Sequence, residues 1–172
     1  MSIFNTTNFE RQGNTDNDLH LKSTEEVCST ILSLSSGALR SIKIFTPDLE
    51  PQLYDNDVFR KNLLNFARGN RHATIQILVA DTTPAIRYGH RLIRLAQQLT
   101  SAMQIRNIPE EYKDIPISFI LIDQSSFLYR ADGSTHNGLQ SVCKHRANKL
   151  QELFTPAWEQ AEQDPQTQRF NL

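Results

Sequence analysis

Basic side chains recur at helical spacing in residues 84–101, which read PAIRYGHRLIRLAQQLTS. At about 100° per residue, four of them share one arc of a helix while the apolar residues face the other way. They are Arg87, His90, Arg91 and Arg94. Cations on one arc can bind a phosphate group or a nucleic-acid backbone. A solvated helix face is the commoner origin of such a stripe, so both interpretations stay open.

Carboxylates form the second candidate set, because each follows closely on a predicted strand: Asp48, Glu50, Asp81 and Asp123. We expect them to converge on one edge of a sheet, where they could hold Mg²⁺ or pair with the arginines. Turn and cap chemistry is the alternative. It is favoured for Asp81, which comes just before a helix start, and it is evenly balanced for Asp48.

Tyr54 and Arg130 complete the candidate binding residues. Tyr54 shares with Glu50 the ten-residue segment 47–56, which is long for a loop of an α/β fold. Arg130 ends the segment FLYR, the expected hairpin partner of the strand before Asp123. We therefore expect Arg130 to face Asp123 across the hairpin, with a structural ion pair as the favoured interpretation.

The other histidines and the cysteines show no catalytic or metal-binding spacing. His72, His136 and His145 are interpreted as surface residues. Cys28 and Cys143 lie far apart and are interpreted as buried, reduced structural thiols. The sequence therefore assigns no catalytic residue, no metal ligand and no cofactor site.

Alternating helices and strands must position these side chains. Ser23 and Glu26 fit a capping box at the start of the first helix. The order α-β-α-β-α-β-β-β-β-α predicts an α/β sandwich with a mixed central sheet flanked by helices. Residues 1–18 are polar and aperiodic, which predicts a flexible arm before a single domain at 19–172. Strands are expected at 41–46, 75–79, 103–108, 117–122, 127–130 and 139–143, the last at a sheet edge, and one helix is expected over 84–101.

Composition restricts the partners and the location. The chain has 172 residues and a formal net charge of −1, so any case for a polyanionic partner must rest on local stripes. No apolar run approaches about 18 residues, and the N-terminal stretch lacks a signal-peptide pattern. These features predict a cytoplasmic protein without a membrane partner.

The element order and several anchor residues resemble one half of the phospholipase D superfamily, over about residues 23–162. Phe154 and Trp158 match the closing helix of such a half, and the family signature, His-x-Lys followed by four residues and Asp, aligns with PISFILID. Asp123 matches the signature Asp, but Pro116 stands in the place of the nucleophilic His and Ser118 in the place of the phosphate-holding Lys. The resemblance implies the fold. It speaks against the reaction, because proline cannot attack phosphorus and serine carries no charge to stabilise the developing anion.

A group of bacterial domains of unknown role, built on this same degenerate half, is a closer resemblance. Its recurring phrases look like TPDLEPxLYD at 46–55, LVAD at 78–81 and GHRLIRLAQQLTS at 89–101. In some bacterial proteins such a domain follows an N-acetyltransferase domain. The segment 130–135 is a near miss to an acetyl-CoA loop and is not interpreted as a cofactor site.

These observations lead to one functional prediction and two alternatives. We predict a non-catalytic binding or dimerisation module that recognises a phosphorylated small molecule or a nucleic acid through the basic helix. The first alternative is a metal-assisted phosphodiesterase or nuclease that uses the four carboxylates, and the second is an assembly domain for an enzyme such as an acetyltransferase. Because enzymes of the resembled superfamily place two halves face to face, the resemblance implies a homodimer.

Overall fold

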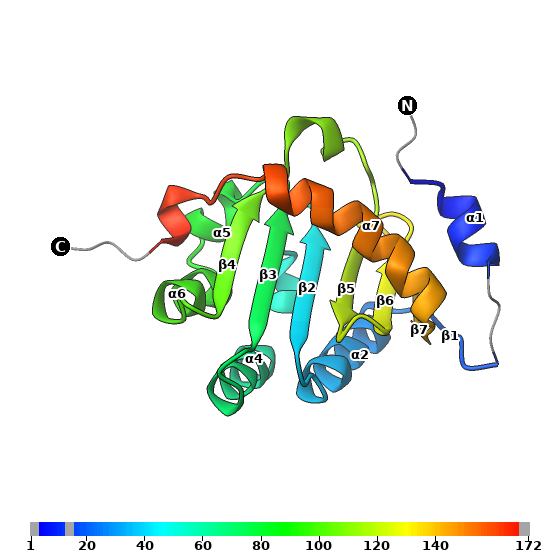
Figure 1. Ribbon diagram of the computed structural model, residues 1–172, viewed down its shortest axis with the longest axis horizontal. Coiled ribbons are helices and arrows are strands. Elements are labelled where there is room, and N and C mark those ends of the chain that lie inside the picture. Colours follow the sequence, from blue (N-terminus) through cyan, green and yellow to red (C-terminus); the bar gives the residue numbers. More distant parts are fainter. Residues whose placement is uncertain (1–3, 13–15, 169–172) are drawn as a thin grey trace.

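A seven-stranded mixed sheet forms the centre of the molecule in a computed structural model, which describes residues 4–12 and 16–168 (Figure 1). The strand order across the sheet is β1-β7-β6-β5-β2-β3-β4. The strands are β1 (Leu19–Leu21), β2 (Ser41–Thr46), β3 (Thr74–Val79), β4 (Met103–Asn107), β5 (Ser118–Ile122), β6 (Ser126–Arg130) and β7 (Gly138–Val142). The six strands expected from the sequence are therefore present, with bounds that differ by at most one residue.

Strand direction decides which residues meet at each end of the sheet. β2, β3 and β4 run parallel to one another, whereas β5 runs antiparallel to β2, and β6, β7 and β1 continue in antiparallel pairs. The carboxyl ends of β2 and β6 therefore lie at the same end of the sheet as the start of β5. In the register, Ser118 at the start of β5 is directly opposite Arg130 at the end of β6.

Helices cover both faces of the sheet, as predicted for an α/β sandwich. Alternation along the strands sends Ile42 and Ile44 into one core and Phe45 into the other. The first core lies under α2 to α6, and the second lies under α7 and α1 (Figure 1). The helices are α1 (Thr6–Arg11), α2 (Thr24–Ser36), α3 (Pro51–Tyr54), α4 (Asp57–Gly69), α5 (Thr83–Arg87), α6 (Arg91–Gln98) and α7 (Lys144–Gln160), with 3₁₀ turns η1 (Glu110–Tyr112) and η2 (Pro165–Thr167).

The described part of the expected N-terminal arm contains regular structure, which corrects the sequence-based interpretation. Asn5 caps α1, and the ring of Phe9 packs 4.4 Å from Tyr129 and 5.7 Å from Phe127, measured between centroids. A single buried aromatic leaves no periodic pattern, so the helix depends on tertiary contacts that the sequence does not display. Residues 1–3 and 13–15 of this arm lie outside the described residues.

β1 changes the position of the strand expected at the sheet edge. It pairs antiparallel with β7, so β7 lies inside the sheet and β1 takes the edge. A three-residue strand is too short to show alternation, which explains why no pattern in the sequence predicts it.

The single helix expected over 84–101 is wrong, because the structure has two short helices there. α5 ends at Arg87 and α6 begins at Arg91. Gly89 between them has φ +72°, a left-handed conformation that interrupts the helical hydrogen bonds, and the His90 side chain then caps α6. No helix among the described residues is long and apolar enough to cross a membrane.

Candidate functional site

A pocket of about 390 Å³ lies at the carboxyl end of β2, beneath the loop 131–137 that joins β6 to β7. Polar side chains from three separate segments of the chain, 24–27, 47–53 and 130–136, line it. We call it the Arg130 pocket. Its polar lining includes Thr24, Asp48, Glu50, Arg130, Thr135 and His136.

Arg130 holds the loop over this pocket. Its side chain is 5% exposed, and Nη1 donates to Glu50 Oε1 at 2.6 Å. Nη2 donates to the carbonyl of Gly133 at 2.7 Å, and Nε donates to the carbonyl of Thr135 at 3.2 Å. All three guanidinium nitrogens are therefore in use. The expected ion pair with Asp123 is wrong, since Glu50 is the carboxylate that Arg130 contacts.

The turn after β2 presents an acceptor without a donor. Asp48 Oδ1 is buried and has no hydrogen-bond partner among the described residues. The next residue, Leu49, has φ +58°, which is strained for a leucine. Two contacts hold this conformation: the Leu49 N–H donates to Thr46 Oγ1 at 3.3 Å, and the Leu49 carbonyl accepts from His90 Nε2 at 2.9 Å. The orientation of Asp48 is thus fixed by its neighbours.

Burial dominates the electrostatics of Glu50 and Tyr54. Desolvation raises the pKa of Glu50 above its ordinary value, even though Arg130 acts in the opposite direction. Burial also raises the pKa of Tyr54, whose hydroxyl interacts with Ser118. Tyr54 is therefore a neutral phenol that belongs to the first core.

The loop 131–137 covers Pro116 and Ser118, the two residues that the resemblance aligns with the His and Lys of the phospholipase D signature. The Gly133 N–H donates to the carbonyl of Pro116 at 2.9 Å. A Cβ added to Gly133 would lie 3.5 Å from Ser118 Cβ and 3.2 Å from Pro47 Cγ, so the loop backbone rests directly on these residues. Ser118 is 1% exposed. The backbone of the loop therefore covers Ser118.

Sequence reasoning missed His136. Its side chain is exposed, as expected, but Nδ1 lies 2.6 Å from Thr24 Oγ1 at the start of α2. This contact ties the loop 131–137 to the start of α2. Because the two residues are separated by 112 positions, no local pattern could have shown it.

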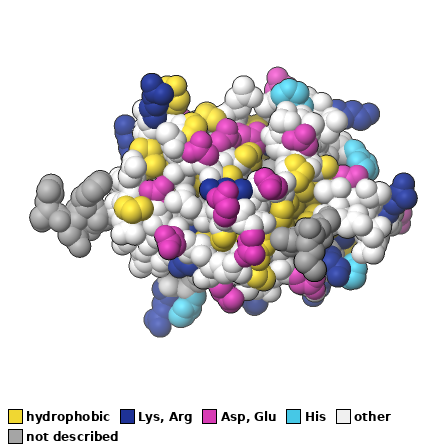
Figure 2. Space-filling model, turned by 90° about the horizontal axis from the view of Figure 1, so that it is seen from above, with side chains coloured by type: hydrophobic (Ala, Val, Ile, Leu, Met, Phe, Trp, Pro, Cys, Tyr) yellow, Lys and Arg dark blue, Asp and Glu magenta, His cyan; other side chains and the backbone are white. Residues whose placement is uncertain are grey.

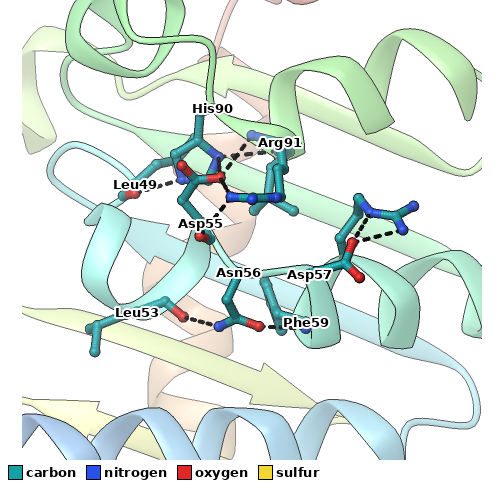
Figure 3. A network of polar contacts seen from close by, with 10 residues as sticks. Leu49, Leu53, Asp55, Asn56, Asp57, Phe59, His90 and Arg91 are labelled. Carbon is teal, nitrogen blue, oxygen red and sulfur yellow. Dashed lines mark hydrogen bonds and ion pairs between the residues drawn. The ribbon is translucent and has the colours of Figure 1, made fainter.

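The basic stripe expected on one helix is divided between α5 and α6. Figure 3 shows two of its members, His90 and Arg91, beside Asp55. Arg91 is engaged with Asp55, whose Oδ1 lies 3.1 Å from Arg91 Nη1. His90 is buried, and its Nδ1 accepts the Leu92 N–H at 3.1 Å while Nε2 contacts the Leu49 carbonyl. Desolvation lowers the pKa of His90, so the imidazole is neutral. Through its contact with the Leu49 carbonyl, His90 helps to hold the turn that carries Asp48 at the Arg130 pocket.

The two remaining arginines of the stripe lie on different helices. Arg87 ends α5 and lies over the ring of Tyr88, with 5.8 Å between Cζ and the ring centroid. Arg94 is exposed on α6. Because the chain turns at Gly89 between them, Arg87 and Arg94 do not extend one continuous helical arc.

The four carboxylates do not converge, which corrects the second expectation. β5 runs antiparallel to β2, so Asp123 lies at the opposite end of the sheet from Asp48. There it accepts the N–H groups of Leu39, Arg40 and Ser41 at 2.9, 2.7 and 3.0 Å. Asp81 is exposed and accepts the Thr83 N–H at 2.9 Å, as the turn alternative predicts. No cluster of three or more metal-ligating side chains occurs among the described residues.

The surface at the end where β2, β3 and β4 finish has mixed charge (Figure 2). Acidic side chains are scattered across this view, and the basic ones stand mainly at its periphery. The described residues on this side thus form no continuous basic surface that would suit a polyanion.

Solved structures share the fold at low sequence identity. TrmBL2, an archaeal chromatin protein that binds DNA, matches with a TM-score of 0.63 and 10% identity over 89% of this chain. The chain spans 56% of the length of TrmBL2. The phospholipase D family member Nuc of Salmonella typhimurium matches with a TM-score of 0.57 and 13% identity, over 79% of this chain and 89% of Nuc.

A second likeness supports the same fold. NucT from Helicobacter pylori matches with a TM-score of 0.59 and 9% identity, over 86% of this chain and 98% of NucT. The architecture is therefore phospholipase D-like, as the resemblance implied. None of the curated proteins compared with the chain is similar to it in sequence. One family model matches residues 23–170, and the chain accordingly belongs to the family described as a domain of unknown function, DUF7931.

Proposed function

We propose that this chain is a non-catalytic binding module and that the Arg130 pocket binds a ligand through an ammonium group. The observation that carries the proposal is Asp48, which lines the pocket and whose Oδ1 is buried without a donor among the described residues. A buried acceptor left unsatisfied costs about 1–3 kcal/mol, so a ligand that donates to it gains that energy.

The charges in the pocket favour a cation over a phosphate. Asp48 and Glu50 contribute two carboxylates, whereas Arg130 is the one guanidinium and its nitrogens are already in use. A phosphate would meet the like charge of Asp48 and Glu50, and each nitrogen of Arg130 already donates to another acceptor. An ammonium group brings three donors and a positive charge.

An organic cation fits better than a divalent metal ion. Mg²⁺ and Ca²⁺ require several oxygen ligands arranged around one point. The described residues form no such cluster, and Asp81 and Asp123, the other two candidate carboxylates, are engaged in contacts elsewhere. The four carboxylates Asp48, Glu50, Asp81 and Asp123 therefore do not form the metal site that the metal-assisted phosphodiesterase or nuclease alternative would use.

The proposal that the module is non-catalytic rests on Pro116 and Ser118, which align with the His and Lys of the phospholipase D signature. Pro116 offers no nucleophile, and Ser118 is covered by the loop that Arg130 holds. Nuc and NucT therefore support a fold for this chain, while the reaction of phospholipase D enzymes is not part of the proposal.

Thermal unfolding with added ligand tests the proposal. The probes are putrescine, which carries two ammonium groups, and inorganic phosphate. Because a ligand that binds the native state raises Tm by mass action, putrescine should raise the Tm by a few degrees at about 100 times its Kd. Phosphate should leave it unchanged.

Two isosteric variants locate the effect. Asp48→Asn should abolish the shift, whereas Asp81→Asn, which alters an exposed carboxylate after the neighbouring strand, should retain it. A shift with phosphate that survives in Asp48→Asn would contradict the proposal and would return the basic residues Arg87 and Arg94 to consideration.

A further inference from the structure

His90 joins two distant parts of the chain through the two nitrogens of its ring (Figure 3). Nδ1 lies 3.1 Å from the backbone nitrogen of Leu92 in the first turn of α6, and Nε2 lies 2.9 Å from the carbonyl oxygen of Leu49. A backbone N–H only donates and a carbonyl only accepts, so Nδ1 is the acceptor and Nε2 carries the hydrogen. The two contacts together therefore require the neutral imidazole.

The Leu49 end of this connection lies between the two carboxylates of the Arg130 pocket. Asp48 and Glu50 both line the pocket, and Leu49 between them is buried with φ +58°. A leucine keeps such a strained conformation only where its surroundings hold it. The contact with His90 is one of the two hydrogen bonds that do so. The orientation of Asp48 therefore depends on His90.

Protonation of His90 is incompatible with this arrangement. The added proton goes to Nδ1, which then becomes a donor that faces the N–H of Leu92. Asp55 Oδ1 lies 3.9 Å from Nδ1, too far for a hydrogen bond, so the ring must shift to pair its new charge. Because the side chain of His90 is only 2% exposed, such a shift disturbs its contact with Leu49 as well.

Three charged groups act on the imidazole from the segments packed against it. Asp55 after α3 and Asp48 after β2 favour the protonated ring, whereas Arg91 on α6 opposes it. Burial outweighs all three and lowers the pKa of His90 below its ordinary value. The ring is therefore neutral at neutral pH and takes up its proton in acid.

We propose that His90 is a positioning residue for the Arg130 pocket and that only its neutral form permits an ammonium ligand to bind there, an inference that rests on the proposed function. Protonation weakens binding in two ways. It releases the Leu49 turn that fixes Asp48, and it places a positive charge near the carboxylate that the ligand contacts. The affinity for a cation should therefore fall as the pH falls.

Two neutral substitutions separate the two hydrogen bonds of His90. Glutamine extends an amide N–H toward the place of Nε2 and can donate to Leu49. Asparagine is shorter, so its carbonyl oxygen can cap α6 but its amide does not reach Leu49. At neutral pH, calorimetric titration with putrescine should show binding retained in His90→Gln and weakened severalfold in His90→Asn. Equal affinities of the wild type and His90→Asn would overturn the proposal.

The pH dependence of the same titration provides a second test. If only the neutral ring permits binding, the Kd of the wild type should rise about tenfold at about one pH unit below the His90 midpoint. Putrescine keeps its charges there, because alkylammonium groups titrate near pH 10, as that of lysine does at about 10.4. Glu50 and His136 also line the pocket, but they are present in His90→Gln too. That variant should lose less affinity over the same range, and parallel losses would contradict the proposal.

A pH titration of the ligand-free ¹⁵N-labelled wild type keeps this proposal distinct from the proposed function. The amides of Asp48 and Leu49 should shift with the midpoint of the His90 ring. The amide of Ser126, at the opposite end of the sheet, should not, which excludes general unfolding. An Asp48 amide that does not follow His90 would overturn the proposal even if putrescine binds. An Asp48 amide that follows His90 in a protein that does not bind putrescine would support the positioning role and contradict the proposed function.

Discussion

Two buried arginines, Arg130 and Arg146, are held in contrasting ways. Arg130 places all three nitrogens against the Glu50 carboxylate and two loop carbonyls. Arg146 places Nη2 against Asp18 and Ser141 and leaves Nε and Nη1 without partners among the described residues. The guanidinium of Arg130 holds the loop 131–137 over Pro116 and Ser118. The guanidinium of Arg146 lies over the ring of Phe127, with 5.5 Å between Cζ and the ring centroid.

The two arginines differ in how fully their buried charge is compensated by hydrogen-bond acceptors. A guanidinium cannot lose its proton in a protein, so burial forces it to find acceptors. Where every guanidinium nitrogen has an acceptor, as in Arg130, the residue is a structural anchor, and binding is left to neighbours such as Asp48. Where nitrogens lack an acceptor, as in Arg146, the burial of the guanidinium is less fully compensated.

The largest effect on stability is expected for Arg130→Met. The substitution leaves the Glu50 carboxylate and the carbonyls of Gly133 and Thr135 without their donor. Breaking a buried ion pair by removing one partner costs about 3–5 kcal/mol, so the free energy of unfolding should fall by about that amount. Urea denaturation measures this loss. A loss below about 1 kcal/mol would show that Arg130 contributes no more than an exposed ion pair and is not a structural anchor.

Arg146→Met should cost roughly half as much. The variant loses the contacts of Nη2, but the penalty of two unsatisfied buried donors disappears with them. Asp18 keeps the hydroxyl of Ser141 as a donor. The same urea series checks the order of the two variants, and an Arg146→Met loss larger than that of Arg130→Met would show that its donors are satisfied after all.

A pH effect on stability is expected from His90, which is buried like the arginines but avoids charge by staying neutral. Desolvation lowers its pKa in the folded state, so between the folded and unfolded pKa values the unfolded chain binds more protons. Its contribution is therefore complete above the unfolded pKa of about 6.5 and declines as the pH falls below it. Urea midpoints from about pH 7 to about pH 5 should decrease in the wild type. The decrease should be shallower in His90→Gln, and an equal slope would contradict the assignment.

The smallest effect is expected for a surface ion pair. Asp57 contacts Arg60 and Lys61 at 2.9 Å each, but its side chain is half exposed. Exposed pairs contribute about 0–1 kcal/mol, so Asp57→Asn should lower the free energy of unfolding by less than about 1 kcal/mol. Thermal or urea unfolding provides this reference for the two buried arginines.

The sequence predicted the strands well because their signal is local. Apolar runs such as 75–79 and 117–122 mark buried strands by composition alone, and the structure confirms the α/β sandwich. Gly89 falls inside the single helix that was expected over 84–101, but its φ is positive. His90, which follows it, contacts the carbonyl of Leu49, 41 residues away in the chain, and such a contact leaves no local pattern.

The site was harder to predict because it depends on strand direction. Asp48, Glu50, Tyr54 and Arg130 lie at one end of the sheet. Asp123, which was expected with them, lies at the opposite end because β5 is antiparallel to β2. A short apolar strand carries no mark of its direction. No sequence pattern indicates the contact between Thr24 and His136 either, because these two residues meet only in the folded chain.

The most direct measurement of the central claim is a titration of the ¹⁵N-labelled protein with putrescine, observed at its backbone amides. The account predicts saturable shifts at Asp48, Glu50 and Thr135 that disappear in Asp48→Asn and persist in Asp81→Asn. Shifts confined to residues outside the Arg130 pocket, or the same pocket shifts with inorganic phosphate in place of putrescine, would contradict it.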